Sequence, residues 1–191
     1  SRARTHARAH MNSMYRMTKT KQAATKSNER GLRRAGNGKK AGGAGKRIQV
    51  RRSGVHGKGV YALQTLKKGE QIIEYIGERI TWPQALKRHP SNPDDPNHTF
   101  FFHLDDQNVI DAGVGGNAAR WINHACKPNC EADEEDGRVF IKALRTIEPG
   151  EELFYDYGLS IDDRYTPKLK AEYACRCGAR KCRGTMLAPK R

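Results

Sequence analysis

Acidic residues are almost absent from the first 52 residues of this 191-residue chain, which hold 16 Lys and Arg but only one acid, Glu29. Large apolar residues are also scarce there, so the stretch cannot bury enough surface to offset the entropy of ordering it. We therefore expect residues 1–46 to form a disordered basic tail. Of the chain's 36 basic and 21 acidic residues, 20 of each lie beyond residue 52, so the net charge of +15 comes from the N-terminal stretch.

Clustered Lys and Arg on an accessible chain can neutralise nucleic-acid phosphates or act as a nuclear import signal. Residues 1–52 therefore suit contact with nucleic acid or nuclear import. A solvated arm that only aids solubility is the alternative, because charge runs are common.

The sequence lacks any run of about 18–20 apolar residues, the length needed to cross a bilayer, so no membrane contact is expected. Its first residues, SRARTHARAH, also lack the apolar core of a secretory signal. Five cysteines cannot all pair in disulfides, which favours a reducing compartment.

Apolar residues recur from Ile48 onward in short runs separated by Gly, Pro, Asn and Asp, a pattern typical of short strands and turns. The dipeptide Asp136-Gly137 is a hairpin signal, because glycine readily takes positive φ. The expected fold is mostly β with short helices. Strands are predicted at 48–51, 60–62, 71–80, 100–104, 109–111, 131–132, 138–143 and 152–155, helices at 83–89 and 117–122, and a loop at 92–97.

Three cysteines lie close together near the C-terminus: Cys175, Cys177 and Cys182. Structural zinc is normally tetrahedral, so a fourth ligand has to come from elsewhere, and only Cys126 and Cys130 are available. Thiolates this dense in a reducing compartment suit zinc, while a local disulfide or free thiols are the alternative. Zinc would tie the C-terminus to the centre of the domain.

Other candidate motifs are ambiguous on their own. The sequence HGKGV beside a strand is typical of a turn as much as of a ligand contact. Asn123-His124, followed by CKPNC, offers several polar groups in one compact turn. Tyr155 and Tyr157 would point to the same face of a strand, as ordinary sheet residues also do.

Five motifs occur in a fixed order: GKGVYA, EYIGE, GNAARWINHACKPNC, FIKALRTIEPGEELFYDYG and CRCGARKCRG. Over residues 48–187 this series resembles the SET-domain lysine methyltransferases, and within them the Set-one and mixed-lineage-leukaemia branch. The resemblance implies a SET-domain fold of short sheets with a C-terminal pseudoknot, in which the chain threads through a loop. It divides the chain into the tail at 1–46, a SET domain at 47–158 and a zinc-binding post-SET segment at 159–191.

The resemblance also implies roles for individual residues. Tyr157 matches the catalytic tyrosine, with Tyr155 beside it, and both line the implied substrate channel together with Phe100. The implied methyl donor is S-adenosylmethionine, held by Lys58, Gly59, Val60, Arg120, Asn123, His124 and Tyr157. The implied ligands of one structural zinc ion are Cys126, Cys175, Cys177 and Cys182, which leaves Cys130 over.

A protonated lysine, with an ordinary pKa of about 10.4, has no lone pair with which to attack a methyl group. Burial in a narrow apolar channel favours the neutral amine, so the Tyr157 hydroxyl needs only to orient it. Family members commonly have a tyrosine where this chain has Phe100, which is either a channel residue or an ordinary core aromatic. Phe100 leaves room for more methyl groups, whereas the hydroxyl of Tyr155 favours fewer, so the number transferred stays open.

The branch that this sequence resembles acts on the ARTKQ segment of histone three, which implies a histone tail as the first substrate. The acidic sequence EADEED at 131–136 would attract a basic peptide, or is simply a solvated turn. The chain's own tail contains KQAATK from Lys21 to Lys26, similar to KQLATK of histone three. Self-methylation of Lys21 or Lys26 is one hypothesis, and chance similarity in a basic tail is the other.

Two further functions stay open: a methyltransferase for a nonhistone basic or DNA-binding protein, and an inactive module that binds chromatin or DNA. The presence of Asn123, His124 and Tyr157 with four matching cysteines favours an enzyme. The expected location is the nucleus or chromatin. For a bacterial protein it would be the cytoplasm or, after secretion, the nucleus of a host cell.

Overall fold

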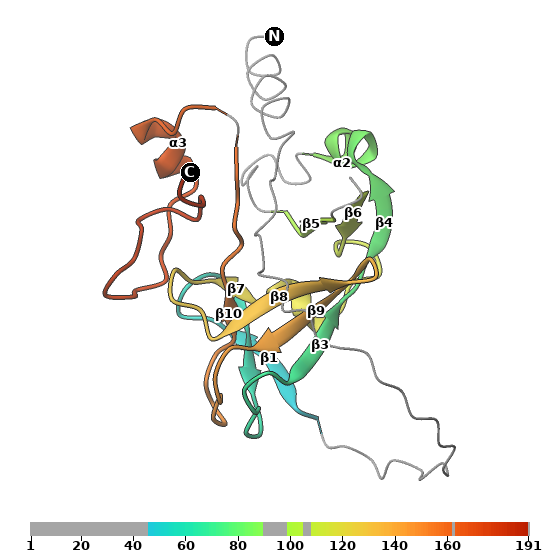
Figure 1. The fold of residues 1–191 in the computed structure, drawn as a ribbon, viewed down its shortest axis with the longest axis vertical. Coiled ribbons are helices and arrows are strands. Elements are labelled where there is room, and N and C mark those ends of the chain that lie inside the picture. The colour runs from blue at the N-terminus through green and yellow to red at the C-terminus, as the bar shows by residue number, and fades with distance from the viewer. Residues whose placement is uncertain (1–45, 90–98, 105–107, 162, 191) are drawn as a thin grey trace, which may run out of the picture.

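The computed structural model describes residues 46–89, 99–104, 108–161 and 163–190 (Figure 1). The tail expected at 1–46 and the loop expected at 92–97 therefore lie, apart from residue 46, outside the described residues.

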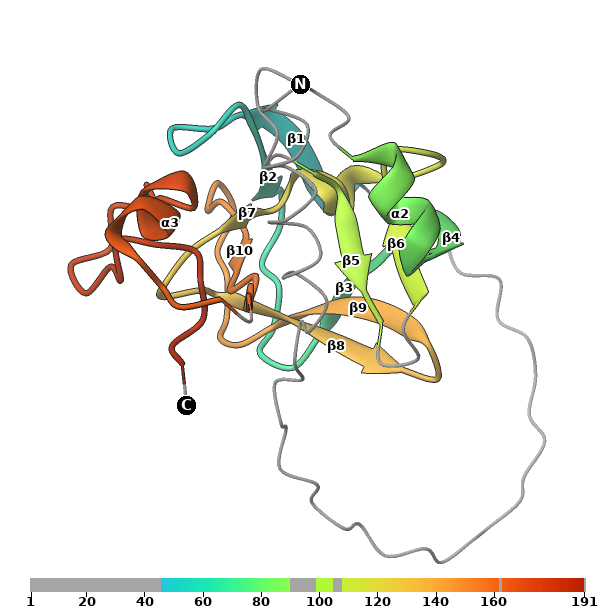
Figure 2. The same ribbon diagram turned by 90° about the horizontal axis from the view of Figure 1, so that it is seen from above.

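Four small sheets form the described part of the chain, which confirms the mostly β prediction (Figures 1 and 2). Three are antiparallel and the fourth is a parallel pair. The sheets are β1 (Ile48–Arg52) with β2 (Lys58–Ala62); β3 (Gln71–Tyr75), β9 (Arg138–Ala143) and β8 (Cys130–Glu135) in that order; β4 (Glu78–Thr81), β6 (Asn108–Asp111) and β5 (Phe101–His103) in that order; and the parallel pair β7 (Asn123–His124) and β10 (Phe154–Tyr155).

The prediction of one strand at 71–80 was wrong, because β3 and β4 belong to different sheets. The chain changes sheet at Ile76-Gly77. A Cβ on Gly77 would lie 2.5 Å from the carbonyl oxygen of Asp111, so only glycine lets the backbone pass this close. The strand predicted at 131–132 is longer, and the one at 152–155 is shorter, than expected.

The helices begin at the signals that their sequences carry. Helix α2 (Trp82–Arg88) follows Thr81, whose backbone N–H donates to the side chain of Gln84 at 2.8 Å. The helix predicted at 117–122 is a 3₁₀ helix, η1 (Ala118–Trp121), in which the side chain of Asn117 accepts the N–H of Ala119. Helix α3 (Pro167–Glu172) was not predicted, although Thr166 before a proline is a start signal.

Two separate hydrophobic clusters hold these elements together. The main core contains side chains with no exposed surface, among them Val60, Leu66, Ile141 and Leu153. The smaller cluster lies in the C-terminal segment and consists of the buried residues Ile161, Leu169, Tyr173 and Leu187. This segment and α3 lie on one side of the β7–β10 pair, and α2 lies on the opposite side (Figure 2). Among the described residues, no helix is long and apolar enough to cross a membrane.

Candidate functional site

The parallel pair β7–β10 brings two distant motifs together, because Phe154 lies beside Asn123 and Tyr155 beside His124. The buried amide of Asn123 donates to the carbonyl of Lys58 at 2.9 Å and to the carboxylate of Glu152 at 3.0 Å. The first bond attaches the GKGV segment to β7.

A side chain at Gly59 would displace the carboxylate of Glu152 at this junction. A Cβ on Gly59 would lie 2.0 Å from Oε1 of Glu152, the same oxygen that accepts from Asn123. A larger residue here would therefore push the Glu152 carboxylate away from the amide of Asn123.

His124 links β7 to the chain that follows β10. The backbone N–H of Tyr157 donates to Nδ1 of His124 at 3.1 Å, and Nε2 lies 3.5 Å from Sγ of Cys126. Burial lowers the pKa of His124 to about 4, against the opposing charge of Asp156, so the imidazole is neutral at pH 7. Because Nδ1 accepts a hydrogen bond, the ring proton is on Nε2 and faces the sulfur.

Three tyrosines, Tyr75, Tyr155 and Tyr157, lie close to one another around β10. The hydroxyl of Tyr157 donates to the carbonyl of Ile122 at 2.9 Å, and its ring centroid lies 4.9 Å from that of Tyr155. The hydroxyl of Tyr75 donates to the carbonyl of Phe100 at 2.9 Å. Burial raises the pKa of Tyr75, Tyr155 and Tyr157, so all three are neutral hydrogen-bonding groups rather than bases.

Two cations share the indole ring of Trp121. Nζ of Lys58 lies 4.5 Å and the guanidinium of Arg120 lies 4.8 Å from the ring centroid, while Phe100 packs edge-on against the same ring. Arg120 donates to the carbonyl of Ala112, but its buried Nε has no hydrogen-bond partner among the described residues. This arrangement suits an anionic group such as a carboxylate.

The ligand atoms of Cys126, Cys175, Cys177 and Cys182 all lie within 4.8 Å of one another, so this cluster can hold a metal ion. Sγ of Cys126 is 3.6 Å from that of Cys175 and 3.8 Å from that of Cys182. Tetrahedral zinc with Zn–S bonds of about 2.3 Å requires sulfurs about 3.8 Å apart, so the geometry fits. Burial opposes ionisation of Cys177, but hydrogen bonds with the backbone of Cys126 and Ala179 lower its pKa to about 7.

Cys130 lies apart from this cluster. It is fully buried at the start of β8, and burial raises its pKa to about 12. The fold therefore places Cys126, and not Cys130, at the fourth position.

An ion pair connects the cysteine cluster to the tyrosines. Arg183, directly after Cys182, donates to both carboxylate oxygens of Asp156, at 2.6 and 2.9 Å. Its backbone N–H also donates to Sγ of Cys126 at 3.4 Å. Asp156 lies between Tyr155 and Tyr157 in the chain, so the C-terminal segment is fixed to the end of β10.

The sequence analysis missed several residues of this site. Tyr75 is part of the EYIGE motif, and Trp121 directly follows Arg120, so their motifs could have indicated them. Glu152 and Arg183 also lie in two of these motifs, but their roles could not be predicted, because the contacts they make join segments far apart in the sequence.

Comparison with known proteins agrees with this geometry. A family model described as the SET domain matches residues 57–158. The chain is 39% identical over 140 residues to histone-lysine N-methyltransferase trithorax of Drosophila melanogaster, covering 71% of this chain and 4% of that protein. It is also 39% identical over 140 residues to histone-lysine N-methyltransferase 2B of Homo sapiens, covering 71% of this chain and 5% of that protein.

A third relative is the histone-lysine N-methyltransferase, H3 lysine-4 specific, of Candida albicans, 39% identical over 144 residues. That match covers 73% of this chain and 14% of the relative, so the chain spans a small part of each of these proteins. The chain belongs to the SET-domain family, which confirms the resemblance found in its motifs.

Proposed function

We propose that this domain transfers a methyl group from S-adenosylmethionine to the side-chain amine of a lysine in a basic protein, with the N-terminal tail of histone three as the first substrate. The observation that carries the proposal is the convergence of Tyr75, Tyr155 and Tyr157 beside Asn123-His124. The names of the three relatives, all histone-lysine methyltransferases, support a histone substrate.

S-adenosylmethionine would supply an electrophilic methyl group, and it also carries a carboxylate. The residues present fit it, because Lys58 and Arg120 lie over one indole and the buried Nε of Arg120 has no partner among the residues described. Gly59 and Val60 would line the cofactor along β2. Asn123 and His124 would complete the pocket from β7, where both side chains are buried.

A target lysine has to lose its proton before it can attack, and an apolar channel lined by Phe100, Tyr155 and Tyr157 would favour the neutral amine. Tyr157 is fixed at two points, by its hydroxyl on Ile122 and its N–H on His124. A side chain held this way can orient the amine without itself accepting a proton.

The number of methyl groups is set by space and hydrogen bonding at the amine. Tyr155 carries a buried hydroxyl, which would hold a partly methylated amine and favour fewer additions. Phe100 offers no hydroxyl and would leave room for more. Both side chains therefore belong in the test of product number.

We also propose that Cys126, Cys175, Cys177 and Cys182 bind one zinc ion. Four thiols at tetrahedral spacing are a soft ligand set, which zinc prefers. The ion would hold the C-terminal segment against β7 and the substrate channel.

The direct test incubates the purified chain with labelled S-adenosylmethionine and core histones, with Tyr157→Phe as the control. Label in histone three from the unmodified chain alone supports the proposal. Label only in another basic protein, when cell extract replaces histones, supports a nonhistone substrate. No transfer to either, with binding to chromatin retained, would show an inactive binding module. Transfer to histones would also support a nuclear or chromatin location.

A further inference from the structure

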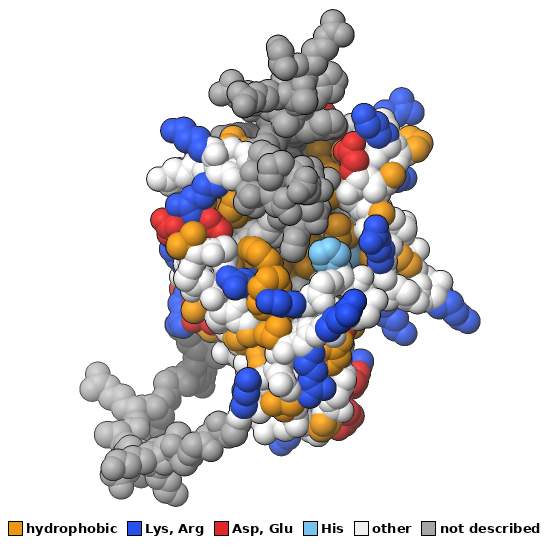
Figure 3. All heavy atoms as spheres, turned by 180° about the vertical axis from the view of Figure 1, so that it is seen from behind, with side chains coloured by type: hydrophobic (Ala, Val, Ile, Leu, Met, Phe, Trp, Pro, Cys, Tyr) orange, Lys and Arg blue, Asp and Glu red, His pale blue; other side chains and the backbone are white. Residues whose placement is uncertain are grey.

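Glu152 lies just before β10 and is half-buried. Lys and Arg side chains are spread widely over the face of the molecule seen in Figure 3. The carboxylate of Glu152, by contrast, is bonded to uncharged side chains of two other strands. Its Oε1 accepts from the amide of Asn123 on β7 at 3.0 Å, and its Oε2 accepts from the hydroxyl of Tyr61 on β2 at 2.9 Å. These contacts join three segments that are far apart in the sequence.

The backbone around Glu152 is also held in place. The carbonyl of Glu152 accepts from the side chain of Asn129 at 2.8 Å, and the N–H of Leu153 donates to the carbonyl of Val60 at 2.7 Å. Glu152 and Tyr61 form an antiparallel bridge. Because the backbone on both sides of the side chain is hydrogen-bonded, the carboxylate has little freedom to move. It can therefore define the positions of its own hydrogen-bond partners.

The amide of Asn123 connects this carboxylate to the start of β2. Its Nδ2 donates to Glu152, to the carbonyl of Lys58 at 2.9 Å and to the carbonyl of His56 at 3.4 Å. Carboxylate and carbonyl oxygens only accept hydrogen bonds, so the NH₂ side of the amide has to face them. The bond to the charged Glu152 is the strongest type among the three. Glu152 therefore does most to set the orientation of the Asn123 amide.

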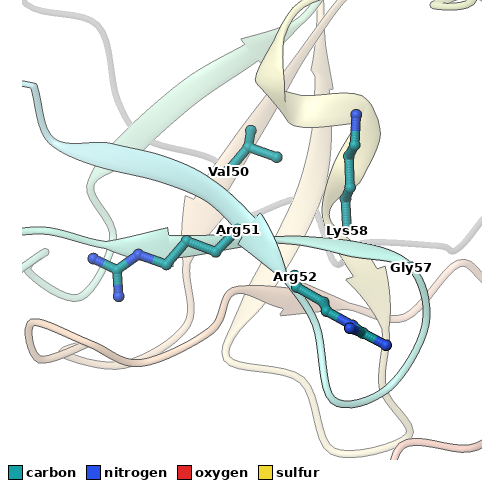
Figure 4. A pocket seen from close by; sticks show the side chains of 5 residues that line it. All are labelled: Val50, Arg51, Arg52, Gly57 and Lys58. Atoms are coloured by element: carbon teal, nitrogen blue, oxygen red, sulfur yellow. The ribbon is translucent and has the colours of Figure 1, made fainter.

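Lys58 belongs to the proposed cofactor site. Its side chain extends from the β1–β2 hairpin toward η1 (Figure 4), where Nζ lies 4.5 Å from the ring centroid of Trp121. Lys58 and Gly57 also line a surface pocket of about 570 Å³ on this hairpin (Figure 4). Lys58 is the first residue of β2, at the end of its pairing with β1. The ends of a strand pair open most easily, so the bond from Asn123 helps to fix the Lys58 backbone here.

We propose that Glu152 is a positioning residue for the methyl donor. It orients the amide of Asn123, which fixes the backbone of Lys58 and so directs the Lys58 side chain toward the carboxylate of S-adenosylmethionine. Glu152 acts through Asn123 and needs no contact with the cofactor itself. Loss of its carboxylate should weaken cofactor binding, and the effect should appear in KM for the cofactor rather than in kcat. This inference rests on the proposed function.

The test measures the Kd of the full chain for S-adenosylmethionine by isothermal titration calorimetry, and KM and kcat with a histone peptide. Glu152→Met keeps the approximate length of the side chain but removes both acceptors, whereas Glu152→Gln keeps one oxygen for Asn123. Glu148→Met is the matched control, because Glu148 lies in the same segment and its carboxylate also accepts from a hydroxyl, that of Thr65, at 3.0 Å. Thermal melting establishes that each variant is folded.

Glu152→Met should raise the Kd for the cofactor roughly tenfold or more, the effect expected when a hydrogen bond to a charged group is lost from a partly buried site. Glu152→Gln should bind with a Kd between those of Glu152→Met and the unmodified chain. The exposed control, Glu148→Met, should bind within about twofold of the unmodified chain. Equal weakening by Glu148→Met and Glu152→Met would overturn the proposal.

A double-mutant cycle tests the route through Asn123. In an Asn123→Ala chain, Glu152→Met should have no further effect on the Kd, because the amide that Glu152 orients is gone. Full additivity of the two changes would overturn the proposal. Glu152→Gln, which keeps the shape of glutamate, replaces Glu152→Met in the cycle if the latter does not melt cooperatively.

The same measurements separate this inference from the proposed function. Normal cofactor binding by Glu152→Met, with binding by the unmodified chain established, would overturn the role of Glu152 alone. Absence of S-adenosylmethionine binding by the unmodified chain would overturn the proposed function together with this inference.

Discussion

Replacing Arg183 with glutamine should slow methyl transfer without emptying the cysteine cluster. Among the described residues, Arg183 makes no hydrogen bond to a tyrosine, but it holds Asp156 with two charge-assisted hydrogen bonds of 2.6 and 2.9 Å. Asp156 stands between Tyr155 and Tyr157, so breaking the ion pair frees the segment that carries the proposed catalytic hydroxyl. Arg183 is in this sense a positioning residue.

The size of the effect follows from the geometry and exposure of the pair. A bidentate pair is stronger than a single neutral hydrogen bond, but the two side chains are 24% and 35% exposed, so solvent weakens it. We expect it to contribute about 1–2 kcal/mol. If all of this free energy is used to position Tyr157, loss of the ion pair in Arg183→Gln should lower kcat roughly 5- to 30-fold.

The assay measures kcat and KM for a histone peptide, together with zinc per chain and the melting temperature. Arg145→Gln is a matched control, because Arg145 also makes two hydrogen bonds to one carboxylate, that of Glu151, which lies before β10 and is not adjacent to either tyrosine in the sequence. The control should keep kcat, and Arg183→Lys should recover part of it. An Arg183→Gln protein with normal kcat, or one whose activity falls only in step with its zinc content, would refute a positioning role.

Four further outcomes are expected. Tyr157→Phe should lower turnover by about 100-fold or more while the melting curve stays cooperative, since the hydroxyl donates only to one backbone carbonyl. A chelator should abolish activity before circular dichroism shows loss of the main core, which lies apart from the C-terminal cluster. Tyr155→Phe should increase, and Phe100→Tyr should decrease, the number of methyl groups found by mass spectrometry. Incubation with S-adenosylmethionine alone tests the self-methylation hypothesis: methyl groups at Lys21 or Lys26 would support it, and an unmodified tail would end it.

The sequence predicted which segments form strands better than it predicted how those strands are arranged in sheets. Alternating apolar residues and turn signals located most strands, because both depend on local chemistry. The change of sheet at Gly77 could not be seen, since its cause is the backbone of Asp111, more than thirty positions away. The spacing of the cysteines could not decide whether Cys126 or Cys130 is the fourth member of the cluster. Tertiary packing decides it, because it buries Cys130 in the main core.

The two residues of β7, Asn123 and His124, each contact a different part of the site. Successive side chains of a strand point to opposite faces, so Asn123 and His124 necessarily face different neighbours. Asn123 faces Lys58 and Glu152. His124 faces Cys126 and the N–H of Tyr157. A shift of β7 by one residue would turn Asn123 and His124 to the opposite faces and break both sets of contacts. The register of β7 against β10 therefore fixes the proposed cofactor pocket, the tyrosine and the cysteine cluster together.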